Sequence, residues 1–374
     1  MNLTSYRTLG KSGLIVSPLA LGTMTFGAER WGAGDKTSRA LFDAYVEAGG
    51  NFIDTADVYS AGRSEEMLGG FVSDSSTRDR LVIATKSGFP RGQGTPLWGG
   101  NGAKNIRMGI EGSLKRLKTD YIDMYWMHVW DRTTPAEEVL QTLTDAVRSG
   151  KILHYGFSNT PAWYVAKVAT LAEAHGLPKP IGLQYAYSLI DRGVELDLIP
   201  AGAEFGLGMV PWSPLAAGLL TGKYGRDKIS DANRATALPD KTGTVTESES
   251  DGRLNGDNPF GGMLFTDRNF DIVDALKAVA SQVGRSPAEV ALAWLAKRTG
   301  VSSVLIGASK VDQLTQNIAS LNVVLEEEHL QRLEEATALP VLNPYFIFQM
   351  PTEMVFGGQK VRGWQMNSNR GTQS

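Results

Sequence analysis

The chain has 374 residues, of which 42% are hydrophobic and 21% charged, and its formal net charge is −3. This composition is typical of a globular protein, and the length suffices for one large domain, which we expect to span residues 1–374. The mildly acidic balance, without a basic cluster, argues against a nucleic-acid-binding surface.

Several missing features narrow the chemistry further. The sequence has no cysteine, which excludes disulfides, thiolate metal sites and cysteine nucleophiles. No apolar run approaches the roughly 18 residues that a membrane span needs, and the first residues lack the pattern of a signal peptide. His154, His175 and His329 show no metal-ligand spacing. We therefore expect a cytoplasmic protein with no membrane partner and no metal.

Short apolar segments, rich in β-branched and aromatic residues, are predicted to be strands. Their continuous apolar character is typical of parallel strands buried on both faces. They lie at residues 19–24, 51–55, 81–86, 121–128, 153–159, 181–187, 208–213 and 304–309.

Amphipathic segments separate these strands. The clearest, TTPAEEVLQTLTDAVRSG, carries Glu137 and Glu138 near the positive end of the predicted helix and Gly150 at its end. NIRMGIEGSLKRLK and PAWYVAKVATLAEAHG have the same character. Strand–helix alternation repeated eight times predicts an α/β fold, a single (β/α)8 TIM barrel. We expect an N-terminal β-hairpin and long loops at the C-terminal face of this barrel.

Two segments depart from the alternation. Residues 225–262 are rich in Gly, Ser, Asp and Thr without periodicity, and we interpret them as a long loop insertion. Residues 340–374 combine aromatic residues with turn formers, and we expect a partly ordered C-terminal tail there.

Polar or aromatic side chains stand at the C-terminal ends of seven consecutive predicted strands. Chemistry belongs at this end of such a barrel, where the loops from strand to helix meet. Any one of these residues has a structural interpretation, but such an interpretation explains the whole set poorly. The residues are Asp54, Tyr59, Lys86, His128, Ser158, Asn159, Gln184, Trp212, Ser213, Gly307 and Ser309.

Four of these residues make chemical sense as a catalytic set. A tyrosine has an ordinary pKa near 10, and a neighbouring ammonium lowers this pKa by stabilising the phenolate. We therefore interpret Tyr59 as a general acid, Lys86 as its activating cation and Asp54 as the carboxylate that holds the lysine. His128 would hydrogen-bond a carbonyl oxygen and orient it. Asp57 and Arg63 are interpreted as a surface turn and the lead-in to a helix.

The sequence resembles an aldo-keto reductase over nearly its whole length. It is most similar to the branch that includes bacterial oxidoreductases and the potassium-channel β subunits. The motifs that carry the resemblance are LALGTMTFG, NFIDTADVYSAGRSEEMLG, VIATKSG, DYIDMYWMHVWDRTTPAEEVLQTLTDAVRSGKI, YGFSN, LQYAYSL, PWSPLAAGLLTGKY and LIGASKVDQLTQNI. The resemblance implies that Asp54, Tyr59, Lys86 and His128 are the catalytic tetrad of this family.

The resemblance also implies a nicotinamide cofactor, NADPH or, as the less favoured alternative, NADH. Lys223 and Arg234 match cations of this branch that lie near the phosphates, which favours NADPH, whereas Gln313 stands where many relatives carry arginine. The implied cofactor-binding residues are Thr23, Met24, Asp54, Ser158, Asn159, Gln184, Trp212, Ser213, Pro214, Leu215, Ala216, Ala217, Lys223, Arg234, Gly307, Ser309, Gln313, Gln316 and Asn317.

The substrate is expected to be a small-molecule carbonyl or alcohol, of a bulky or apolar kind. Trp31, Trp130, Tyr345 and Phe346 are candidates, with Tyr59, for the lining of its pocket; packing in the core or in a crevice is an equally good interpretation of these four. The sequence is consistent with either a monomer or a homo-oligomer.

The sequence leads to one expected function and leaves two alternatives. The expected function is NADPH-dependent interconversion of a carbonyl and an alcohol. The first alternative is a regulatory or redox-sensing protein that binds NADPH with little turnover. The second is a barrel aldolase in which Lys86 forms a Schiff base, and the cofactor-binding motifs argue against it.

Overall fold

The computed structural model describes residues 1–28, 32–73, 75–228, 254 and 261–361. It divides into two units, residues 1–337 and residues 338–374. Trp31, Arg234 and most of the predicted insertion at 225–262 lie outside the described residues.

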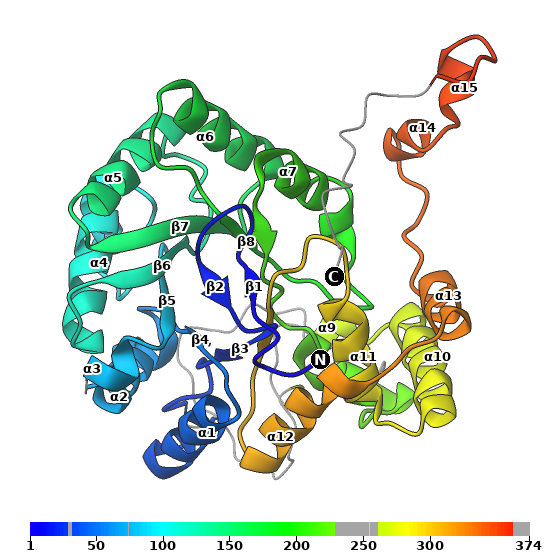
Figure 1. Cartoon of the computed structure of the whole chain (residues 1–374), viewed down its shortest axis with the longest axis horizontal. Helices are drawn as coiled ribbons and strands as arrows, with labels where there is room; N and C mark the ends of the chain where they lie inside the picture. Colours follow the sequence, from blue (N-terminus) through cyan, green and yellow to red (C-terminus); the bar gives the residue numbers. More distant parts are fainter. Residues whose placement is uncertain (29–31, 74, 229–253, 255–260, 362–374) are drawn as a thin grey trace, which may run out of the picture. The chain divides into compact units, whose positions relative to one another are not determined.

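A parallel sheet forms the centre of the first unit (Figure 1). Its strands follow one another around the sheet in chain order, with β10 placed beside β3. The strands are β3 (Leu19–Gly22), β4 (Phe52–Asp54), β5 (Val82–Ser87), β6 (Ile122–Met127), β7 (Ile152–Ser158), β8 (Gly182–Gln184), β9 (Gly208–Met209) and β10 (Val304–Ile306).

Backbone hydrogen bonds close this sheet into a barrel. The Met209 N–H donates to the Gly300 carbonyl at 2.8 Å, and the Ser302 N–H donates to the Met209 carbonyl at 2.8 Å. The Leu305 N–H donates to the Pro211 carbonyl at 2.9 Å. These bonds join the last strand of the sheet to the segment that enters and forms β10, so no edge remains open there. The predicted (β/α)8 barrel is confirmed.

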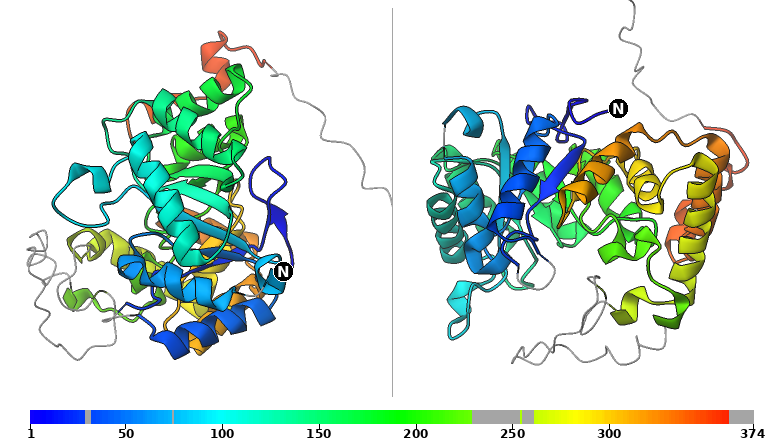
Figure 2. Two further views of the ribbon diagram at one scale, coloured as in Figure 1. Left: turned by 90° about the vertical axis from the view of Figure 1, so that its left-hand side faces the viewer. Right: turned by 90° about the horizontal axis from the view of Figure 1, so that it is seen from below.

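Helices follow the strands of the sheet and lie outside it in the views of Figure 2. The apolar faces of the longer helices cover the outer surface of the barrel, as the amphipathic pattern predicts. They are α1 (Asp35–Glu47), α2 (Arg63–Phe71), α3 (Ser75–Arg78), α4 (Ala103–Leu117), α5 (Ala136–Arg148), α6 (Ala162–Ala174), α7 (Leu198–Phe205), α9 (Gly261–Leu264), α10 (Asp267–Val283), α11 (Pro287–Ala296), α12 (Val311–Ala319) and α13 (Glu327–Ala336).

The predicted strands are confirmed, but several end earlier than expected. The largest difference is in β9, which ends at Met209, followed by β8 and β10, which end at Gln184 and Ile306. Beyond these points a single bridge joins Ala186 to Trp212, and the Trp212 N–H donates to the Tyr185 carbonyl at 2.9 Å. The hydrogen-bond ladder between β8 and β9 is interrupted here because both segments leave the sheet and enter their loops.

Apolar side chains fill the interior of the barrel, and an N-terminal hairpin contributes to this filling. The hairpin pairs β1 (Arg7–Thr8) with β2 (Ile15–Val16), which confirms its prediction. Its Leu9, Leu14 and Val16 pack with residues of the strands. The inner cluster contains Leu9, Leu14, Val16, Ala20, Phe52, Val82, Ala84, Met124, Trp126, Ile181, Val210 and Leu305.

The second unit is the C-terminal tail. It contains two short helices, α14 (Tyr345–Phe348) and α15 (Thr352–Val355). The described part of this unit ends at residue 361.

Two glycines make room for Trp126 inside the barrel. A Cβ atom on Gly156 would lie 2.6 Å from the Trp126 ring, and one on Gly182 would lie 2.8 Å from it. Because Trp126 is fully buried, the ring cannot move aside.

We predict that Gly156→Ala lowers the free energy of unfolding by about 1–3 kcal/mol, because overpacking a filled core forces strain. Gly70→Ala in α2 is the control, since a Cβ there has no atom within 4 Å. The control should be neutral or stabilise by up to about 1 kcal/mol. Chemical denaturation of both variants measures the difference, and equal stabilities would contradict the packing argument.

Candidate active site

A buried ion pair lies at the mouth of the barrel. Lys86, at the C-terminal part of β5, forms an ion pair with Asp54, the last residue of β4. The Lys86 ammonium also donates to the Thr55 carbonyl at 2.6 Å and contacts the Tyr59 hydroxyl at 3.2 Å. The second oxygen of Asp54 accepts a hydrogen bond from Gln184 at 2.9 Å. Both carboxylate oxygens are therefore acceptors, as an ionised Asp54 requires.

Burial and charge act in opposite directions on this pair. Burial raises the pKa of Asp54, while Lys86 and Gln184 act to lower it. Burial alone would lower the pKa of Lys86, but Asp54 and Tyr59 outweigh it, so the pKa of the lysine is raised. The raised pKa keeps Lys86 an ammonium beside the phenol.

Tyr59 stands in a sharply turned segment after β4. Its ring lies beneath the Lys86 ammonium, 4.7 Å from the ring centre. Ser60, Ala61 and Gly62 follow it in the left-handed backbone region, with φ of 48°, 55° and 93°. Only glycine adopts this region without steric cost, so the turn is strained at the first two residues. The strain lies directly beside the candidate general acid.

His128 completes the group at the end of β6. Its ring centre lies 6.0 Å from that of Tyr59. Burial, with the nearby Lys86 charge, holds the pKa of His128 well below its ordinary value, so the imidazole is neutral at pH 7. Its buried Nδ1 has no hydrogen-bond partner among the described residues, so the Nε2–H tautomer leaves no buried donor unpaired.

Candidate cofactor residues border the tetrad. The Asn159 amide donates to the Ser158 hydroxyl at 2.9 Å, and its oxygen accepts from the Trp212 indole N–H at 3.3 Å. Thr23 is buried and its hydroxyl donates to the Asp54 carbonyl at 3.1 Å, while the neighbouring Met24 is half-buried. The ends of four strands thus bring these polar groups to one edge of the barrel.

The loop after Trp212 turns repeatedly through the left-handed region. Ser213, Ala216 and Ala217 have φ near 50°, and the Ser213 hydroxyl accepts from the Ala217 N–H at 3.1 Å. Pro214 and Leu215 lie between them. A sharp backbone turn of this kind forms a concave surface suited to an anion.

A third group lies where β10 leads into α12. Gln313 caps this turn by accepting from the Ser309 N–H at 3.0 Å, and Asn317 donates to the Gly307 carbonyl at 3.2 Å. Gln316 is exposed on the same helix. A Cβ atom on Gly307 would meet no atom within 4 Å, so the surface before it is open. The exposed Lys223 follows the turn at 213–217, with its ammonium 5.2 Å from the Tyr224 ring centre.

The candidate residues of the substrate pocket lie in different parts of the structure. Trp130 is half-buried two residues after His128 and packs edge to face on Trp163, with ring centres 5.6 Å apart. Tyr345 and Phe346 belong to the second unit, in α14.

Two features of the site escaped the sequence analysis. Phe89 packs edge to face against His128, with ring centres 4.7 Å apart. Asp57 is not a surface turn: its carboxylate is buried and pairs with Arg91 at 3.2 Å. That expectation was wrong because the loop after β5 covers Asp57, and a pairing across 34 residues leaves no local signal.

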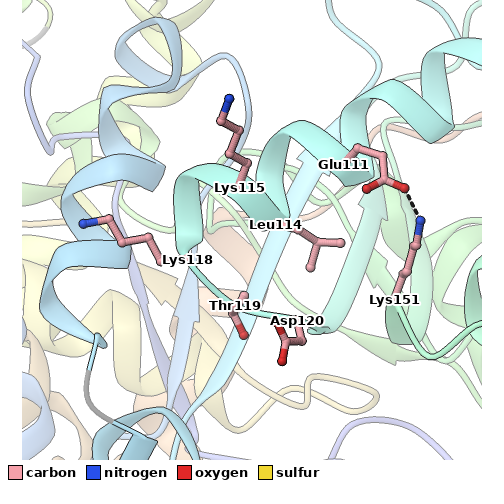
Figure 3. Close-up of a pocket in the computed structure, with 7 residues that line it drawn as sticks. All are labelled: Glu111, Leu114, Lys115, Lys118, Thr119, Asp120 and Lys151. Carbon is pink, nitrogen blue, oxygen red and sulfur yellow. Dashed lines mark hydrogen bonds and ion pairs between the residues drawn. The ribbon is translucent and has the colours of Figure 1, made fainter.

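A surface hollow elsewhere has no connection with these groups. Its volume is about 480 Å³, and it is lined by Glu111, Leu114, Lys115, Lys118, Thr119, Asp120 and Lys151 (Figure 3). Asp120 precedes β6 and Lys151 precedes β7, so the hollow lies at the end of the barrel opposite the tetrad. The ion pair between Glu111 and Lys151 lies along one side of it.

The described part of the chain has neither a metal-binding cluster nor a membrane-spanning helix. Among these residues no group of three or more His, Cys, Asp or Glu side chains is arranged to hold a metal ion. No helix within them combines the length and apolar character needed to cross a membrane.

Comparison with known proteins identifies the family. The model of the aldo/keto reductase family matches residues 18–338. A norsolorinic acid reductase of Emericella nidulans is 34% identical over 96% of this chain and 88% of its own length. An aryl-alcohol dehydrogenase [NADP(+)] of Phanerodontia chrysosporium is 33% identical over 90% and 86%, respectively. A probable voltage-gated potassium channel subunit beta of Oryza sativa subsp. japonica is 36% identical over 88% and 95%.

We predict that the His128 imidazole shows no titration between pH 6 and 8 in an NMR pH series, because burial and Lys86 lower its pKa. Lys86→Met should raise this pKa by removing one of the two causes, while burial still keeps it below 6.5. The unfolded chain binds a proton near pH 6.5 and the folded chain does not, so this group makes stability fall as pH falls below 6.5. An ordinary His128 pKa in the native protein would contradict the assignment.

Proposed function

We propose that this chain, which belongs to the aldo/keto reductase family, is an NADPH-dependent oxidoreductase that interconverts aldehydes or ketones and alcohols. One observation carries the proposal: the buried Lys86 ammonium contacts both the Asp54 carboxylate and the Tyr59 hydroxyl. A phenol beside a fixed ammonium is suited to donate a proton and take it back.

The roles of the four residues follow from their contacts. In reduction, Tyr59 donates its hydroxyl proton to the carbonyl oxygen, and Lys86 stabilises the phenolate that remains. Asp54 holds Lys86 as an ammonium. The neutral His128 donates a hydrogen bond to the same carbonyl oxygen and orients the substrate. NADPH, when bound, would supply the hydride for the carbonyl carbon. Oxidation of the alcohol reverses these steps.

The residues present fit a nicotinamide dinucleotide. Asn159 is hydrogen-bonded to both Ser158 and Trp212, which supports binding of a carboxamide and a flat ring there. The turn at 213–217 and the exposed Lys223 suit phosphates. Lys223, with the resemblance at Arg234, favours NADPH, and the NADP(+)-specific name of the aryl-alcohol dehydrogenase relative agrees with this preference.

The aromatic surroundings of the site favour an aromatic carbonyl as substrate. Phe89 packs against His128 and remains two-fifths exposed, and Trp130 lies two residues after His128 beside the exposed Trp163. Rings of this kind bind flat apolar molecules by stacking and edge contacts. The name of one relative, an aryl-alcohol dehydrogenase, points to the same class.

A second function is kept because one relative is a probable channel β subunit, 36% identical to this chain. On this alternative the protein binds NADPH tightly and turns over little. The two functions differ in steady-state turnover, which the tetrad alone does not decide.

We predict that Tyr59→Phe lowers kcat for aldehyde reduction by about 10²–10⁴-fold, because the proton donor is lost. The dissociation constant for NADPH, measured by fluorescence, should not change. NADPH absorbance over time measures turnover in both proteins. Unchanged turnover in the variant would refute the role of Tyr59; negligible native turnover with tight NADPH binding would favour the regulatory alternative.

We predict that Trp163→Ala raises KM for an aromatic aldehyde such as benzaldehyde about 10-fold, because a stacking surface is lost. KM for a short aliphatic aldehyde should stay within about twofold and serves as the control. An equal change for both aldehydes would contradict the aromatic pocket.

A further inference from the structure

A buried ion pair links the segment that carries Tyr59 to the loop after β5. Asp57 lies two residues before Tyr59, and its backbone N–H donates to the Lys86 carbonyl at 3.1 Å. Its carboxylate, with no exposed surface, pairs with the Arg91 guanidinium at 3.2 Å. Neither residue belongs to the tetrad.

Arg91 fixes the shape of its own loop. Its guanidinium donates to the Asn105 side chain on α4 at 2.6 Å, and Asn105 donates to the Gly100 carbonyl at 2.6 Å. The Arg91 N–H donates to the Trp98 carbonyl at 3.0 Å, and the Gly100 N–H donates to the Gly88 carbonyl at 2.8 Å. The loop 88–102 is thus closed on itself. It is attached to the segment before Tyr59 through Arg91, and to the segment after β6 through Asn101, whose side chain donates to the Val129 carbonyl at 2.8 Å.

This loop carries the aromatic side chain that contacts the tetrad. Phe89 stands two residues before Arg91, and its ring meets the His128 ring at an interplanar angle of 83°. His128 in turn lies 6.0 Å from the Tyr59 ring centre. The contact between Asp57 and Arg91 therefore couples the position of Phe89 to the segment of the general acid.

We propose that Asp57 and Arg91 form a positioning pair for the substrate. The pair holds Phe89 against His128, so that a bound aromatic carbonyl lies with its oxygen between His128 and Tyr59. The inference rests on the proposed function and extends it to two residues that do not touch the reacting atoms.

A purely structural role explains this pair poorly. Asp57 is buried, yet its Oδ1 has no hydrogen-bond partner among the described residues, so the carboxylate is only partly compensated. Burial, and then the charge of Glu65 on α2, raise the pKa of Asp57 to about 6, although Arg91 and Arg116 act to lower it. Tyr125 on β6 also lies within its electrostatic reach.

The raised pKa of Asp57 allows an experiment to separate a role in substrate positioning from a role in stability. The folded state binds a proton on Asp57 more tightly than the unfolded state does, so the ionised group costs stability above about pH 6. Removing the charge should therefore leave the stability at pH 7 unchanged or raise it. A structural ion pair would show the opposite result.

The experiment compares Asp57→Asn, Arg91→Gln and the double variant in the full chain, with NADPH and benzaldehyde. We expect kcat/KM for the aldehyde to fall about 10- to 100-fold in each single variant, since small displacements have effects of this size. The NADPH dissociation constant should not change. The double variant should lose no more than the worse single variant, because the two residues act as one unit.

Two measurements distinguish a substrate-positioning role of the pair from a purely structural role. Native kcat/KM should decline on the acid side near pH 6, where Asp57 is protonated, and this decline should be absent in Asp57→Asn. The melting temperature of Asp57→Asn at pH 7 should not fall. Arg63→Gln is the matched control. Arg63, the first residue of α2, forms an exposed ion pair with Asp35, and its removal should change neither the pH profile of kcat/KM nor the melting temperature.

Amide hydrogen exchange tests the restraint without any activity. Exchange at Arg91 and Gly100 should be faster in Asp57→Asn and unchanged in Arg63→Gln. Unchanged kcat/KM and exchange in the variants, or a loss of stability with unchanged kcat/KM, would overturn the proposal. If the native protein reduces no carbonyl, the proposed function fails and exchange alone decides: faster exchange supports the restraint, and unchanged exchange overturns it.

Discussion

The ion pair between Lys86 and Asp54 is the interaction on which the site depends. Two charges with almost no exposure to water are costly unless every remaining donor and acceptor has a partner. Here the partners come from separate parts of the barrel: the Thr55 carbonyl, the Tyr59 hydroxyl and the Gln184 amide. The barrel must therefore hold β4, β5 and β8 in register to within the tolerance of a hydrogen bond. The close-packed cluster of side chains around Trp126 in the barrel interior holds the strands in position with this accuracy.

Most of the fold follows from the sequence, because both its signals are local. Strands that are buried on two faces consist of continuous runs of apolar residues. In the helices between them, apolar residues recur every three to four positions. The same regularity places chemistry-bearing residues at the ends of strands, so Asp54, Lys86 and His128 were recognisable before their distances were known. The ends of β8 and β9 were less predictable. Strand pairing stops where two neighbouring segments diverge, so it depends on both segments and not on the sequence of one.

What the sequence did not reveal depends on distant contacts. Asp57 looks like a loop carboxylate, and only the loop 88–102 makes it a buried one. Phe89 has no pattern that directs it to His128. Gln184 was expected to serve a nicotinamide, and its contact with Asp54 arises from the curvature that brings β8 across the barrel from β4. In each case the environment is made by residues that local patterns do not connect.

The separation of the site's components along the chain has a consequence for folding. Asp54 and Lys86 are 32 residues apart, whereas Asp54 and Gln184 are 130 residues apart. Contacts between distant residues carry a larger loop-closure cost and tend to form late. An intermediate that contains β3 to β6 can bring the two charges together, but it lacks the amide that fixes the second carboxylate oxygen. The carboxylate is therefore fully bonded only when β8 has joined the sheet. We expect any activity to return late on refolding, when the barrel is nearly closed.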